Sequence, residues 1–264
     1  MLGAIIGDIV GSRFEFHNYK SKQISLFEGK CRPTDDSIMT LAVAAALMEA
    51  GEDADALGSC AVEWMQRLGR SYPDCGFGGM FRRWIHSDDP QPYGSYGNGA
   101  AMRISPVGFY ARGEDELKRL SRVITAVSHD HPEALKGAEA TAMAIYLART
   151  GSDMDAIRER IERDYYRIDF TLDGIRETYA FDVSCQGSVP QALEAFFESE
   201  SFEDAIRNAI SIGGDSDTIA AITGGIAEAF YGVPTAIAWV AEQYLDGAQR
   251  DILNRWRTFM EKRT

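Results

Sequence analysis

The amino-acid sequence predicts an all-α fold, and three observations support this prediction. Apolar residues recur at helical spacing along most of the chain, whereas strand-like alternation never continues for more than a few residues. Several stretches are rich in the strong helix formers alanine and leucine. No Pro-, Ser- or Gly-rich linker and no fixed-period repeat divides the 264 residues. We therefore expect one compact helical domain over residues 1–264, long enough to bury a sizeable core.

The first part of the chain is expected to alternate helices with polar or glycine-rich loops. The helix at 36–50 is apolar almost all round, so it should lie buried at the centre of the fold. A polar loop over 13–32 precedes it, and a loop over 87–99 is rich in turn residues. Loops of that length are more often functional than short connections are. The helices expected in this part span residues 3–10, 36–50, 55–68 and 80–85.

Helical periodicity continues through the rest of the chain with one interruption. The segment 164–187 is the least regular part of the sequence and leaves room for an extended piece. The four tryptophans are expected in the core or in helix packing, because their large rings contribute most when buried; they are Trp64, Trp84, Trp239 and Trp256. The helices expected here span residues 114–127, 132–149, 154–163, 189–197, 202–210, 217–230, 234–245 and 252–260.

Charge and cysteine usage limit the classes of partner and compartment. A net charge of −13 and a pI near 4.8 argue against a broad surface for nucleic acid or anionic membranes. The four cysteines are scattered without a C-x-x-C pair, which favours reduced thiols over disulfides or zinc. We find no signal-peptide pattern and no apolar run near the roughly 20 residues that span a bilayer. A cytoplasmic protein without membrane attachment is expected.

Two acidic stretches stand at expected helix starts far apart in the sequence. Residues 212–218 read Ile-Gly-Gly-Asp-Ser-Asp-Thr, and residues 33–37 read Pro-Thr-Asp-Asp-Ser. Either stretch alone is more simply a helix cap, because Asp and Thr often occupy that position. Together they offer a set of carboxylate and hydroxyl oxygens that suits Mg²⁺ or Mn²⁺ better than zinc.

Three further segments complete a recognisable pattern with these two. They are residues 3–11 (GAIIGDIVG), residues 97–103 (GNGAAMR) and the pair Ser128-His129. In order and spacing, the five segments resemble the ADP-ribosylglycohydrolase family, which includes dinitrogenase reductase-activating glycohydrolase and the ADP-ribosylarginine and ADP-ribosylserine hydrolases. The resemblance covers residues 3–232, most of the chain.

This resemblance implies a compact, orthogonal all-α fold with a binuclear magnesium centre, for which Mn²⁺ could substitute, at the bottom of an ADP-ribose cleft. The implied reaction is hydrolysis of the bond between ADP-ribose and a modified protein or small-molecule acceptor, with release of ADP-ribose. The implied catalytic groups are Asp35, Asp36 and Glu15, a loop glutamate suited to proton transfer or to positioning water. The implied metal ligands are Thr34, Asp35, Asp36, Asp215, Asp217 and Thr218.

The resemblance also implies a ligand-binding set made largely of glycine-rich loops. Backbone N–H groups that approach closely can hold a diphosphate without net positive charge, which suits an acidic chain. Arg103 either contacts the ligand or pairs with a buried carboxylate, and we favour a structural role. His131 is expected to be a bystander, since no third nitrogen or sulfur ligand for zinc lies nearby. The implied ligand-binding residues are Gly76, Gly78, Gly79, Gly94, Ser95, Tyr96, Gly97, Asn98, Gly99 and His129.

Two other functions compete with this interpretation. Residues 215–218 superficially match the D-x-D-x-T of haloacid-dehalogenase-type phosphatases, but the preceding residues make a poor strand. A catalytically inactive ADP-ribose binder or crystallin-like protein is the stronger alternative. The presence of every implied acidic ligand favours an enzyme. The sequence does not decide the acceptor, the oligomeric state, the identity of the general acid or base, or the preference for Mg²⁺ or Mn²⁺.

Overall fold

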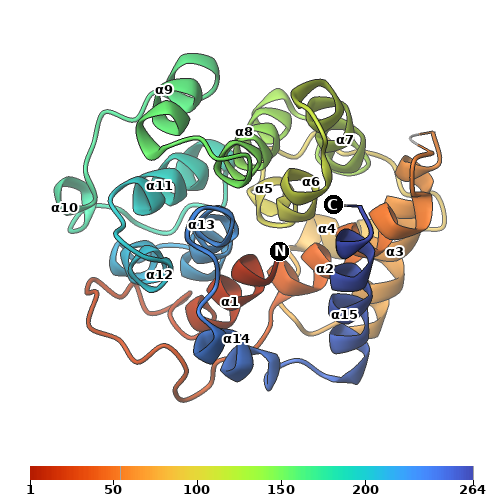
Figure 1. The fold of residues 1–264 in the computed structure, drawn as a ribbon. Coiled ribbons are helices and arrows are strands. Elements are labelled where there is room, and N and C mark those ends of the chain that lie inside the picture. The colour runs from red at the N-terminus through yellow and green to blue at the C-terminus, as the bar shows by residue number, and fades with distance from the viewer. Residues whose placement is uncertain (54, 264) are drawn as a thin grey trace.

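The computed structural model describes residues 1–53 and 55–263 and has an all-α architecture, as the sequence predicts (Figure 1). Within these residues there are fifteen helices and no strand. The helices are α1 (Leu2–Gly11), α2 (Asp35–Ala50), α3 (Leu57–Ser71), α4 (Gly79–Ile85), α5 (Gly99–Met102), α6 (Ser105–Tyr110), α7 (Glu114–Ala126), α8 (Pro132–Arg149), α9 (Met154–Asp164), α10 (Leu172–Ile175), α11 (Cys185–Phe197), α12 (Phe202–Ser211), α13 (Ser216–Tyr231), α14 (Thr235–Glu242) and α15 (Gly247–Glu261).

Helix α1 packs directly on α13 through glycines spaced four residues apart. A Cβ added at Gly7 would lie 1.9 Å from the carbonyl oxygen of Ala220, and one added at Gly3 would lie 2.2 Å from that of Gly224. Real Cβ atoms do not approach backbone so closely, so only glycine permits this separation between the two helices. The close packing holds Asp8, which projects from α1, next to the first turn of α13.

Helix α2 lies in the middle of the molecule, between α1 and α3 (Figure 1). Every residue from Asp36 to Leu47 is buried, which confirms the prediction of a central helix that is covered on all sides. Thr34 caps its N-terminus by accepting a hydrogen bond from the Asp36 N–H at 3.4 Å. Gly51, with φ of +57°, ends it. The acidic start of α2 is thereby fixed within the core. The acidic start of α13 lies there too, because Asp215 and Asp217 are also buried.

Some elements differ from the sequence prediction. Helices α5 and α6 were not expected, because each is too short to show a clear apolar period. Helix α11 begins at Cys185 instead of at residue 189 and includes Pro190. The Ser184 hydroxyl accepts from the Gly187 N–H at 3.1 Å and caps the earlier start. Burial of Val189, Pro190 and their neighbours in the core offsets the backbone hydrogen bond that proline cannot donate.

Trp239 does not lie in the core, which is one of the two positions expected for it. Its side chain is 68% exposed, whereas Trp64, Trp84 and Trp256 are buried as predicted. Trp239 lies on α14, a surface helix of which only Ala241 is buried. The residue type alone favours burial, but the position of α14 at the edge of the fold leaves this ring in solvent.

The irregular segment between α9 and α11 includes a short extended piece that meets the loop before α5. Gly97 and Ser184 form an isolated antiparallel bridge. The Asn98 N–H donates to the Val183 carbonyl at 2.8 Å, and the Cys185 N–H donates to the Tyr96 carbonyl at 2.9 Å. These bonds fix the backbone of the glycine-rich loop at 94–99.

Two expectations from composition can be compared with the structure. All four cysteines are free, in agreement with the expectation of reduced thiols. Among the helices of residues 1–53 and 55–263, none has the length and hydropathy needed to cross a bilayer.

Candidate active site

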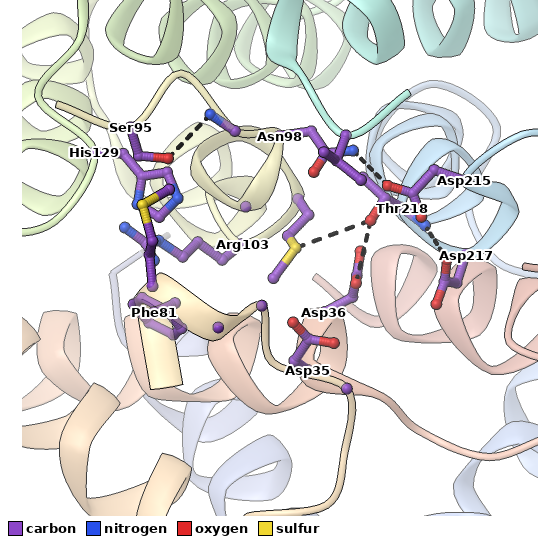
Figure 2. A pocket seen from close by; sticks show the side chains of 18 of the residues that line it. Asp35, Asp36, Phe81, Ser95, Asn98, Arg103, His129, Asp215, Asp217 and Thr218 are labelled. Atoms are coloured by element: carbon purple, nitrogen blue, oxygen red, sulfur yellow. Dashed lines mark hydrogen bonds between the residues drawn. The ribbon is translucent and has the colours of Figure 1, made fainter. Parts of the chain in front are cut away.

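The two acidic helix starts and the glycine-rich loops line one pocket of about 560 Å³. Figure 2 shows the carboxylates of Asp35, Asp36, Asp215 and Asp217 on one side and His129 with Phe81 on the other. This volume lies within the range of pockets that hold small molecules. All the residues proposed from sequence line the pocket except Thr34, Gly94 and Tyr96.

Five carboxylates gather at the acidic side of the pocket in two overlapping groups. In one group, carboxylate oxygens of Asp8, Asp36 and Asp217 lie within 4.8 Å of one another. In the other, oxygens of Glu15, Asp215 and Asp217 do so. Asp217 belongs to both groups and therefore joins them. Segments from the start, the first quarter and the end of the sequence thus converge on one centre.

Asp8 is the residue of this centre that sequence reasoning missed. Its carboxylate accepts from the Thr34 hydroxyl at 2.6 Å, from the backbone N–H groups of Thr34 at 2.8 Å and Ser37 at 3.0 Å, and from the Ser37 hydroxyl. It therefore fixes the first turn of α2. The available signal was a lone carboxylate inside the apolar segment 1–10.

The hydrogen bonds of Asp215 and Asp36 show whether their carboxylate oxygens cap a helix and which of them are free to bind a cation. Asp215 stands at the N-cap of α13 but makes no capping bond; its Oδ2 accepts from the Asn98 side-chain amide at 2.6 Å. Asp36 Oδ2 accepts from the Thr218 hydroxyl at 3.3 Å. Asp36 Oδ1 is buried and has no hydrogen-bond partner among the described residues. A buried carboxylate oxygen without a donor is suited to a cation.

Burial raises the pKa values of the carboxyl groups in this cluster. It raises the pKa of Glu15 to about 7, with the charge of Asp215 adding to the effect, and raises that of Asp35 to about 7, with Asp8 adding. Burial and neighbouring carboxylates hold the pKa values of Asp36 and Asp217 well above their ordinary range. In the described part of the chain, no Lys or Arg forms an ion pair with these groups. The repulsion is of the kind that bound divalent cations relieve.

The glycine-rich loop at 76–79 leaves space in the pocket for a ligand. Gly76 has φ of +132°, and a Cβ there would lie 2.6 Å from Asp35 Oδ1. Added Cβ atoms at Gly78 and Gly79 would meet nothing within 4 Å. The space in front of these two residues allows a ligand to approach their backbone closely.

Gly94 and Tyr96 belong to the same loop but do not line the pocket. The Gly94 N–H donates to Asp130 Oδ1 at 2.7 Å, and the half-exposed Tyr96 ring lies edge-on to His131 at 5.4 Å. His131 itself caps α8 by accepting from the Glu133 N–H at 3.1 Å. Its ring nitrogen has a structural role, in line with the expected bystander.

Arg103 lines the pocket, is fully buried and has no carboxylate partner among the described residues. The expected alternative of an ion pair is therefore wrong. Its Nη2 donates to the Ser128 hydroxyl at 2.8 Å, and its guanidinium lies 5.3 Å from the centre of the Phe81 ring. Cation–π attraction compensates part of the cost of burying this charge.

The fold and the site together define an all-helical protein with a carboxylate centre beside a glycine-lined pocket. A family model described as ADP-ribosylglycohydrolase matches residues 1–261. The chain belongs to this family.

Several relatives are similar to the chain over most of their length. The chain is 25% identical to ADP-ribosylhydrolase ARH3 of Mus musculus, covering 88% of this chain and 83% of that protein. It is 27% identical to the ADP-ribosyl-dinitrogen reductase glycohydrolase of Rhodospirillum rubrum (88% and 84% covered) and 27% identical to the ADP-ribosylarginine hydrolase Tri1 of Pseudomonas putida (88% and 70% covered). A solved structure titled ADP-ribosylglycohydrolase-related protein complex shares the fold, with a TM-score of 0.67 at 23% identity over 97% of this chain and 96% of that one.

Proposed function

We propose that this protein is a metal-dependent hydrolase that cleaves the glycosidic bond between ADP-ribose and a modified acceptor. The observation that carries the proposal is the orphaned, buried Asp36 Oδ1 within a carboxylate cluster at one side of a ligand-sized pocket. Membership of the ADP-ribosylglycohydrolase family supplies the substrate class.

The donor set fits two Mg²⁺ ions, with Mn²⁺ as a substitute. Carboxylate and hydroxyl oxygens are the ligands that these hard cations prefer. Thr34 donates its hydroxyl proton to Asp8, which leaves an oxygen lone pair free for a cation. When bound, the cations would supply positive charge that orients ribose hydroxyls and makes water a better nucleophile. The proposed ligands are Thr34, Asp35, Asp36, Asp215, Asp217 and Thr218.

The chain's own residues would bind the ligand and exclude water around it. Backbone of the loops at 76–79 and 94–99 would hold the diphosphate, since it can approach anionic oxygens without a net positive surface. His129 would contact the ligand at the other side of the same pocket. Asn98 connects the loop to the carboxylate centre, because its side-chain amide donates to Asp215. The Ser95 hydroxyl accepts from the Gly97 N–H at 3.1 Å and holds the turn of the loop.

Glu15 is suited to move a proton during the reaction. In the metal-free protein, burial and the charge of Asp215 raise the pKa of Glu15 to about 7, so this carboxyl group exchanges a proton near neutral pH, and bound cations would lower that pKa. Glu15 would accept a proton from the attacking water and return it to the leaving acceptor. Cleavage of a glycosidic bond develops positive charge on the ribose ring, so the nearby carboxylates of Asp35 and Asp36 would stabilise the transition state.

The test is hydrolysis of defined substrates, with free ADP-ribose as the readout. Peptides ADP-ribosylated on arginine or on serine, and O-acetyl-ADP-ribose, would each be incubated with Mg²⁺ or with EDTA. We expect turnover of at least one substrate with Mg²⁺ and loss of turnover with EDTA. Tight ADP-ribose binding without turnover of any substrate would instead identify an inactive binding protein, and turnover that EDTA leaves unchanged would contradict metal dependence.

A further inference from the structure

Arg103, Ser128 and His129 form a continuous hydrogen-bonded chain beside the glycine-rich loop, and its two end residues line the pocket. Arg103 Nη2 donates to Ser128 Oγ at 2.8 Å, and Ser128 Oγ lies 2.8 Å from His129 Nδ1. Both Arg103 and Ser128 are fully buried. Figure 2 shows the Arg103 side chain extending toward His129, on the side of the pocket away from Asp217.

The direction of each hydrogen bond follows from the number of protons available. A guanidinium only donates, so Ser128 Oγ accepts from Arg103. The Ser128 hydroxyl proton then needs an acceptor, and among the described residues the only other partner of this oxygen is His129 Nδ1. If Nδ1 carried a proton, it would donate to Oγ and leave the hydroxyl proton unpaired in a fully buried position. Such groups are strongly disfavoured.

His129 is therefore neutral with its proton on Nε2, because the bond made by one ring nitrogen determines which nitrogen is protonated. Its surroundings agree with a neutral ring. Burial and then the nearby Arg103 charge keep the pKa of His129 well below its ordinary value. The rings of Phe81 and Tyr93 flank the imidazole and fix its plane, with ring centroids 5.9 Å and 5.5 Å from the imidazole centroid.

The protonated nitrogen lies beside the glycine-rich loop. A Cβ added at Gly99 would lie 3.2 Å from His129 Nε2, and one added at Gly97 would lie 3.7 Å away. All three residues line the pocket. An Nε2–H at this position offers a donor to a ligand oxygen, whereas a bare Nε2 would present a lone pair and repel a phosphate.

We propose that Arg103 and Ser128 are positioning residues that hold His129 as the neutral Nε2–H tautomer, so that the ring donates a hydrogen bond to an oxygen of bound ADP-ribose. The ligand part of this inference rests on the proposed function. The tautomer does not, because it follows from the ligand-free geometry. Ser128 does not line the pocket and acts through His129, whereas Arg103 lines the pocket as well as holding Ser128.

The tautomer can be measured directly by NMR on protein labelled with ¹⁵N at histidine. The chain has only four histidines, and the spectrum of the His129→Gln variant assigns the signals of His129 by their loss. Two-bond correlations between ring protons and nitrogens distinguish a protonated from an unprotonated nitrogen. We expect Nε2 protonated and Nδ1 unprotonated in the ligand-free wild type, and a mixed tautomer in Ser128→Ala. A protonated Nδ1 in the wild type would overturn the proposal.

The effect on the ligand is measured by calorimetry with ADP-ribose on folded variants. Ser128→Ala should weaken binding about tenfold, the effect of one good hydrogen bond, and Ser128→Thr should restore it by returning the hydroxyl. If Ser128→Ala fails to fold, Ser128→Cys replaces it, since a thiol keeps the volume but forms weak hydrogen bonds. A purely structural role would lower the melting temperature of these variants and leave their affinity unchanged, which would overturn the ligand part.

A second pair of variants tests the position of the donor without changing Ser128. Glutamine places an amide N–H near the position of Nε2, whereas asparagine places it near Nδ1. We expect His129→Gln to bind ADP-ribose more tightly than His129→Asn. Equal affinities, or tighter binding by His129→Asn, would contradict donation from Nε2. A wild type that binds no ADP-ribose would refute the proposed function and the ligand part together, while the NMR spectrum would still decide the tautomer.

Discussion

At the scale of single residues, substitutions at Asp217 and at Glu15 are expected to reduce activity for different reasons. Asp217 belongs to both carboxylate groups, so Asp217→Ala should disrupt the whole of the proposed metal centre. Glu15→Gln should remove one proton-transfer step, which contributes about 100-fold to 10,000-fold in rate. We expect Asp217→Ala to lose more kcat than Glu15→Gln, and Mg²⁺ affinity to fall further in Asp217→Ala, because Glu15 belongs to one carboxylate group and Asp217 to both. Folded variants, verified by circular dichroism, that both hydrolyse at the wild-type rate would refute these roles.

Asp8 should matter for the geometry of the centre and for stability. Asn in its place keeps one acceptor oxygen but presents an N–H₂ group to donors from Thr34 and Ser37. We expect Asp8→Asn to lower the free energy of unfolding by about 1–3 kcal/mol and to weaken Mg²⁺ binding. Chemical denaturation and calorimetry measure the two effects. The matched control is Asp88→Asn, an exposed loop carboxylate, which should change neither.

The residues of the site differ in how far the sequence could predict them. Asp36, Asp215 and Asp217 stand in acidic motifs at helix starts, and such motifs are visible in one dimension. Asp8 has no such motif, and its proximity to the other carboxylates depends on the packing of α1 on α13. Arg103 shows the same limit, because its partner Ser128 is distant in sequence and binds through a hydroxyl instead of a carboxylate.

At the scale of secondary-structure elements, the contact between α1 and α13 leaves no room for a larger side chain at Gly7. Gly7→Ala would place a methyl group where Ala220 backbone already lies. We expect a loss of about 1–3 kcal/mol or more in unfolding free energy, as for overpacked cores, and weaker Mg²⁺ binding because the carboxylates move apart. Gly247→Ala, in the first turn of α15 with nothing within 4 Å of the added Cβ, is the control and should be neutral or slightly stabilising. Equal melting temperatures for the two variants would contradict this packing argument.

Local signals explain which elements were predictable. The central helix was expected over 36–50 and spans Asp35–Ala50, because a capping threonine precedes it and a glycine follows. Helix α13 was expected over 217–230 and spans Ser216–Tyr231, ending at Gly232. The early start of α11 and the exposure of Trp239 depend instead on tertiary surroundings, which sequence periodicity does not contain.

At the scale of the whole molecule, the carboxylate cluster should couple stability to pH and to metal. Glu15 and Asp35 have pKa values of about 7 in the folded state, above their ordinary values of 4.5 and 3.8. The folded state therefore binds protons more tightly than the unfolded state, and this cluster lowers stability as pH rises from about 4 to 7. At pH 8 Glu15 and Asp35 are largely ionised in metal-free protein, so their repulsion is present.

The difference in stability between metal-free wild type and metal-free Asp36→Asn reports the repulsion within the cluster, because the other titrating groups are the same in both proteins. The variant should be more stable than wild type at pH 8, and the difference should shrink toward pH 5, as measured by thermal unfolding in EDTA. Saturating Mg²⁺ should reverse the order at pH 8, since a ligand at 100 times its Kd adds about 2.7 kcal/mol. A difference between the two proteins that does not change with pH would contradict the coupling.

The central claim is that the cluster around Asp36, Asp215 and Asp217 binds divalent cations next to an ADP-ribose pocket. Crystals grown with Mn²⁺ and ADP-ribose test it most directly, because the anomalous signal of manganese locates each ion without assumptions about the surrounding atoms. We predict two anomalous peaks among these carboxylates, with ADP-ribose between the peaks and the loop at 94–99. Ordered ADP-ribose in the pocket with no anomalous peak at the cluster, or peaks only at surface carboxylates, would contradict the account.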